Sequence, residues 1–129
     1  MAKSTFALVT ALLALTASAM ARKEQIHGKV NRDGSVTAFG TRRTTSSSGN
    51  IYFSLVQFPE CADLLYLRVN PTGDKPPFDW RKFTHSDFGR KISLGNGVLS
   101  GTTFTIDARL SPAVNANCET SFSGPLEWN

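Results

Sequence analysis

Residues 51–58, IYFSLVQF, and residues 64–69, LLYLRV, decide the fold class of this 129-residue chain. Large apolar residues occupy every second position in both stretches: Ile51, Phe53 and Leu55, then Leu65, Leu67 and Val69. A period of two is typical of strands with one buried face, and β-branched and aromatic residues favour the same structure. The two stretches therefore predict two strands that bury one face each, and Pro71 is expected to end the second.

Upstream of these stretches, residues 26–30 alternate in the same way, with Ile26 and Val30 as apolar positions. An Asn31-Arg32-Asp33-Gly34 turn follows, and Val36 and Ala38 continue beyond it. Asp-Gly suits the positive φ angles of a tight hairpin turn, so we expect a β-hairpin here. Residues 41–50, TRRTTSSSGN, have no apolar anchor and predict a polar loop.

Downstream, further short apolar runs are separated by residues that break regular structure. Gly95-Asn96-Gly97 predicts a turn between residues 92–94 and 98–99, and Pro112 ends the alternating run 104–108. A last short strand is expected over 119–123, before Pro125, and a helical turn over 80–83. The pattern predicts an all-β domain, a small antiparallel sandwich or barrel of about seven short strands.

Residues 1–21 have the layout of a secretory signal peptide. Lys3 precedes the apolar run 6–15, and the small residues ASAMA follow, which allows cleavage after Ala19 or Ala21. The apolar run is short for a bilayer span, which needs about 20 residues, and no second candidate span follows it. We expect a single all-β domain over 22–129, secreted or held in the periplasm or at the cell surface.

The two cysteines, Cys61 and Cys118, fit this interpretation. An even number of cysteines in an exported chain predicts a disulfide. Two cysteines without a neighbouring histidine do not make a metal site, so we expect no metal and no cofactor.

Residues 75–91 form the segment most suited to binding. Prolines interrupt it, and aromatic residues alternate with cations, an arrangement that can stack on rings and pair with anions. The proposed contacts are one aromatic anchor and four cations: Trp80, Arg81, Lys82, Arg90 and Lys91. The competing interpretation is that the aromatic residues cover the core and the cations are ordinary solvated charges.

The charge balance limits the partner. The chain carries a net charge of +4, which falls to +3 when Lys3 leaves with the leader. That charge is modest for a nucleic-acid-binding protein, but nucleic acid is not excluded. The first hypothesis is therefore an exported binding domain for an acidic polysaccharide, another acidic envelope polymer or a protein partner.

Two alternatives remain open. A small secreted nuclease or related hydrolase would use His27 and His85 for proton transfer, because the pKa of histidine lies near neutrality. A protease inhibitor would present a stiff loop, such as residues 75–77 or 59–61. No nucleophile elbow, phosphate-binding loop or Asp-rich calcium loop occurs in the sequence.

Overall fold

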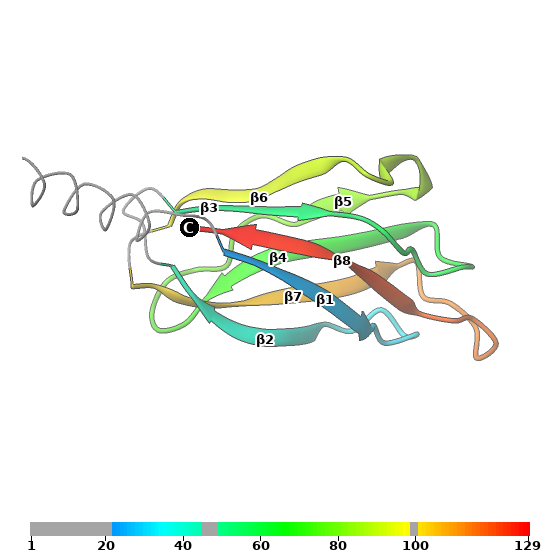
Figure 1. Cartoon of the computed structure of the whole chain (residues 1–129). Helices are drawn as coiled ribbons and strands as arrows, with labels where there is room; N and C mark the ends of the chain where they lie inside the picture. Colours follow the sequence, from blue (N-terminus) through cyan, green and yellow to red (C-terminus); the bar gives the residue numbers. More distant parts are fainter. Residues whose placement is uncertain (1–21, 45–48, 99–100) are drawn as a thin grey trace, which may run out of the picture.

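The computed structural model describes residues 22–44, 49–98 and 101–129, which form two packed antiparallel sheets (Figure 1). Sheet A has the strand order β1-β8-β3-β6, and sheet B has the order β2-β7-β4-β5. The bounds in sheet A are β1 Arg22–Lys29, β8 Ser121–Trp128, β3 Gly49–Ser54 and β6 Lys91–Val98. Those in sheet B are β2 Thr37–Arg43, β7 Thr103–Ser111, β4 Leu64–Pro71 and β5 Arg81–Phe83, and a 3₁₀ turn, η1, covers His85–Asp87. The predicted antiparallel sandwich is confirmed, with eight strands in the described residues.

The core lies between the two sheets. The alternating residues of the two deciding stretches are all fully buried: Ile51, Phe53, Leu55, Leu65, Leu67 and Val69. The rings of Phe53, Phe83 and Phe122 meet edge to face, with centroids 5.6 and 6.2 Å from that of Phe53. Burial of this apolar face is the main favourable contribution to the stability of a sandwich of this size.

The predicted hairpin between β1 and β2 is wrong. The turn itself forms, with Gly34 at φ 84° and its N–H donating to the carbonyl of Asn31. However, β1 pairs with β8 and β2 pairs with β7, in different sheets. The ring of Phe39 occupies the space that a side chain at Gly28 would need. β1 and β2 therefore lie in different sheets and face each other across the sandwich. The strands with which they pair, β8 and β7, come much later in the chain.

The predicted turn at Gly95-Asn96-Gly97 is also wrong, because β6 continues through these residues to Val98. A Cβ atom at Gly95 would clash with the ring of Phe78. Gly95 is required because the ring of Phe78 lies close against the backbone of β6. The sequence does not distinguish a glycine of this kind from one that makes a turn. Leu99 lies outside the described residues.

Two further boundaries differ from those predicted. The last strand extends to Trp128 through Pro125, which pairs with Gln25 of β1 and lies beyond the end of the β3–β8 ladder. Proline has no backbone N–H to donate, and none is needed here because β3 does not pair with Pro125. Residues 81–83 form β5 rather than a helical turn, and the 3₁₀ turn begins at His85, after a Thr84 cap.

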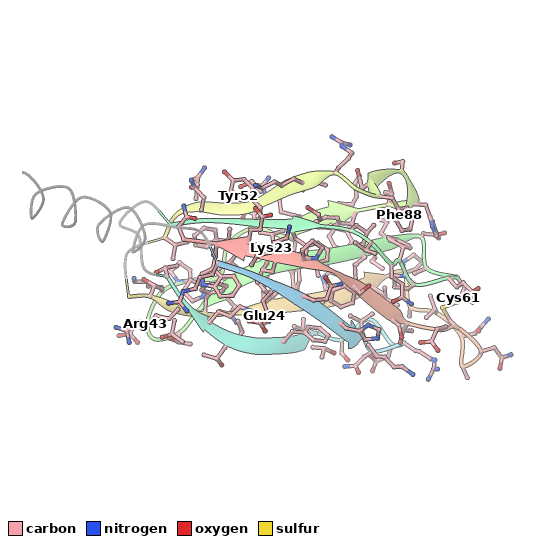
Figure 2. The ribbon with its side chains drawn as sticks, in the orientation of Figure 1. Lys23, Glu24, Arg43, Tyr52, Cys61 and Phe88 are labelled. Atoms are coloured by element: carbon pink, nitrogen blue, oxygen red, sulfur yellow. A yellow bond between two sulfur atoms is a disulfide. The ribbon has the colours of Figure 1, made fainter. Side chains whose placement is uncertain are left out.

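The ends of residues 41–50 also differ from the predicted loop, since β2 and β3 extend into this range. Positions 45–48 lie outside the described residues, as does the predicted signal peptide. No helix among the described residues is long and apolar enough to cross a membrane. The predicted disulfide between Cys61 and Cys118 is confirmed, and it joins two loops at the end of the sandwich opposite the C-terminus (Figures 1 and 2).

Candidate functional site

The residues proposed from segment 75–91 are distributed over several surfaces. Trp80 and Lys82 belong to the outer face of sheet B. Arg81 lines a cleft between β5 and β6, on the other side of the same strand. Arg90 follows the 3₁₀ turn and pairs with Asp87 at 3.1 Å. The structure therefore brings only part of the proposed set together.

The position of Trp80 follows from the extended path of residues 78–83 beside β4. The N–H of Phe78 donates to the carbonyl of Val69 at 2.9 Å, and Arg81 pairs with Leu67. Trp80 lies between these two points and is thereby placed opposite Arg68. Phe83, the residue after Lys82, is buried. Because alternate residues of a strand project to opposite faces, the side chain of Lys82 points outward.

Aromatic rings and guanidinium groups alternate on this outer face. The guanidinium carbon of Arg109 lies 4.7 Å from the ring centroid of Tyr66 and 4.9 Å from that of Trp80. The guanidinium carbon of Arg68 lies 4.2 Å from the ring of Trp80. We call these four residues, together with Lys82, the sheet B stack. Such contacts stabilise by about 0.5–1 kcal/mol each at exposed sites.

A buried carboxylate holds one end of the stack. Asp107, whose side chain is 3% exposed, accepts a hydrogen bond from Nε of Arg68 at 3.0 Å. The amide of Asn70 donates to the same oxygen at 3.1 Å, and the hydroxyl of Thr105 approaches the other oxygen. A charge-assisted pair with additional donors fixes the guanidinium plane of Arg68 and hence the ring above it.

Arg109 differs from Arg68 in the partners of its guanidinium group. Among the described residues this side chain makes no ion pair and no hydrogen bond, and two rings lie against it. Stacking occupies the faces of a guanidinium group and leaves its in-plane N–H donors available. The N–H donors of Arg109 therefore have the geometry to pair with a carboxylate or another oxyanion.

On the outer face of sheet A, lysines pair with a carboxylate. Glu127 lies between two lysines, 2.6 Å from Nζ of Lys91 and 3.6 Å from Nζ of Lys23. The hydrogen bond from Lys91 lowers the pKa of Glu127, and the same bond raises the pKa of Lys91. Lys91 also lies over the ring of Tyr52. Its charge is thus matched within the protein, unlike that of Arg109.

The two histidines are held in different environments. His27 is exposed in β1, where it pairs with Ser123 of β8. His85 begins the 3₁₀ turn, and its ring packs against Phe58 at 4.2 Å between centroids. No ring contact, hydrogen bond or ion pair joins these histidines in the part of the chain that the structure describes. Nor do the described residues include a cluster of three potential metal ligands.

Sequence reasoning missed Tyr66, Arg68 and Arg109. The signal was present, because each occupies an outward position of an alternating strand whose other positions are apolar. An outward residue of a strand is ordinarily in contact with solvent, and only the pairing of β4 with β7 brings Tyr66 opposite Arg109.

The fold and this surface together define a small disulfide-linked β-sandwich with a row of stacked guanidinium groups on one outer face. Comparison with known proteins finds no matching family model, no matching curated protein and no matching solved structure.

Proposed function

We propose that this protein is an exported binding domain that holds an acidic polysaccharide of its surroundings, such as an acidic envelope polymer, on the sheet B stack. The observation that supports this proposal best is Arg109, a guanidinium that packs against two rings and has no polar partner in the part of the chain that the structure describes. A side chain that is already ordered loses little conformational entropy on binding, which favours affinity.

The chemistry of the stack favours carboxylate groups. Guanidinium groups pair with carboxylates through two parallel hydrogen bonds, and Lys82, which makes no ion pair among the described residues, adds a second unmatched charge. A polymer with repeated carboxylates could contact both cations in turn. Repeated weak contacts raise the overall affinity through effective concentration.

Nucleic acid suits this surface less well. The rings of Tyr66 and Trp80 already stack on guanidinium groups of the protein, which leaves less ring surface for bases. The net charge is also modest for phosphate-backbone binding.

The disulfide and the predicted leader support the exported location in this proposal. The disulfide between Cys61 and Cys118 is typical of an oxidising compartment. The predicted leader over 1–21 indicates the route, and acidic polysaccharides are components of cell surfaces and their surroundings.

Titration calorimetry with polygalacturonate over a salt series tests this proposal. We expect salt-sensitive binding, at least tenfold weaker affinity for Arg109→Gln, and unchanged affinity for Arg22→Gln. The control removes the same charge from an exposed position on β1. An equal loss of affinity in both variants would show that only the net charge matters and not the position of Arg109. Binding of RNA in preference to polygalacturonate would overturn the choice of partner.

A further inference from the structure

A second concave site lies on the other side of β5, between the edges of the two sheets. This cleft has a volume of about 290 Å³ and is open to solvent. Its lining combines apolar and polar residues from the segment 77–81 and from β6: Pro77, Phe78, Asp79, Arg81, Leu94, Gly95 and Asn96. Figure 1 shows β5 and β6 along the same side of the sandwich.

Packing and a backbone hydrogen bond restrict the position of Phe78 at the floor of the cleft. The ring of Phe78 fills the space beside Gly95 that a Cβ atom would need, and Leu94 is 1% exposed. The backbone of Phe78 is fixed by its bond to Val69. Most of the surface that the cleft offers to a ligand is polar, and the partly exposed ring of Phe78 supplies an apolar part that is already in place.

The two charges in the lining decide what kind of ligand fits. Asp79 and Arg81 both line the cleft, as expected for alternate residues of an extended segment. Neither makes an ion pair with the other or with any other described residue. A purely anionic ligand would be repelled by Asp79, and a purely cationic ligand by Arg81. A ligand that carries both charges satisfies both side chains.

We propose that this cleft binds a small zwitterion of the α-amino-acid class with an apolar side chain. The ammonium group pairs with Asp79, the carboxylate pairs with Arg81, and the side chain lies against the exposed part of the Phe78 ring. Alternate residues of an extended chain are about 7 Å apart, a spacing that allows an amino-acid head group between the two charged ends. Asn96 also lines the cleft, and its side-chain amide is a further hydrogen-bond donor for the carboxylate.

The site is independent of the sheet B stack. Lys82 of β5 and Trp80, just before this strand, project from the opposite side of the segment, so an amino acid and an acidic polymer would bind on different surfaces. The failure of one proposal therefore leaves the other standing.

Amide NMR of the disulfide-bonded protein, titrated with L-leucine, tests the inference. We expect saturable shifts at Phe78, Arg81 and Gly95, and no comparable shifts at Tyr66 or Arg109. Two analogues that keep one charge each, 4-methylpentanoate and isoamylamine, are expected to bind at least tenfold more weakly. Unshifted cleft amides, or binding of either analogue as strong as that of leucine, would overturn the proposal.

Two variants add an independent check. Asp79→Asn should weaken leucine binding at least tenfold, whereas Asp74→Asn, an exposed loop residue outside the cleft, should leave it unchanged. Unchanged affinity of Asp79→Asn would contradict the assigned role. The comparison of leucine with its analogues uses the unaltered protein and stands even where a variant fails to fold.

Discussion

Asp107→Ala is the substitution whose cost can be worked out most directly. Its carboxylate is almost fully buried and accepts hydrogen bonds from Arg68 at 3.0 Å and Asn70 at 3.1 Å. Removing one partner of a buried ion pair costs about 3–5 kcal/mol, because the remaining charge loses its compensation. Here the side chain of Arg68 is 23% exposed, so water recovers part of that loss. We expect the free energy of unfolding to fall by about 2–3 kcal/mol.

Urea denaturation followed by tryptophan fluorescence measures this change, which should appear as a lower midpoint with an unchanged slope. For a domain of this size the melting temperature should fall by about 10 °C. Asp63→Ala, which removes an exposed carboxylate without hydrogen bonds among the described residues, should change stability by less than about 0.5 kcal/mol.

A double-mutant cycle with Arg68→Ala separates the pair from its surroundings. We expect a coupling energy of about 1–2 kcal/mol, as for groups in direct contact. A loss below about 1 kcal/mol for Asp107→Ala, or strict additivity in the cycle, would refute the conclusion that this carboxylate holds the sheet B stack.

Other predictions concern the disulfide, the core and the charges of sheet A. Reduction and alkylation of Cys61 and Cys118, 57 positions apart, should lower the free energy of unfolding by about 4 kcal/mol, and an unchanged urea midpoint would contradict this. Phe53→Ala should cost about 3–5 kcal/mol in the same assay, because this ring is fully buried between the sheets; a cost near that of an exposed residue would show that the core is described wrongly. The pKa of Glu127 is lowered by Lys91, so the pair stabilises the fold at neutral pH and this contribution is lost as the pH falls through the folded-state pKa. Carboxyl NMR should show that pKa rising in Lys91→Gln, and an unmoved titration would exclude the assigned cause.

The fold class was predictable because burial imposes a period of two on each strand. Residues 51–55 and 65–69 carry that period without interruption, and their burial follows it. The pairing of strands was not predictable in the same way. The Asp33-Gly34 turn predicts a local reversal, but whether β1 then pairs with β2 or with β8 depends on sequence about a hundred residues away.

The candidate site was predictable only in part, for a related reason. Trp80 and Lys82 were identified by composition, since aromatic and basic residues are adjacent in the sequence. Arg109 and Tyr66 are separated by many residues and meet through a strand register that no local pattern specifies. Gly95 shows the same limit, because a glycine required by a ring of another segment is indistinguishable in sequence from a glycine that makes a turn.

The most direct test of the central claim observes the Arg109 guanidinium itself. The Nε–H resonance of Arg109, assigned by comparison with Arg109→Lys, would be followed while a galacturonate oligomer is added. Binding at the sheet B stack predicts a saturable shift of this resonance, with none at the exposed Arg22 used as a reference. An Arg109 signal that stays in place while the oligomer binds elsewhere, or does not bind, would contradict the account.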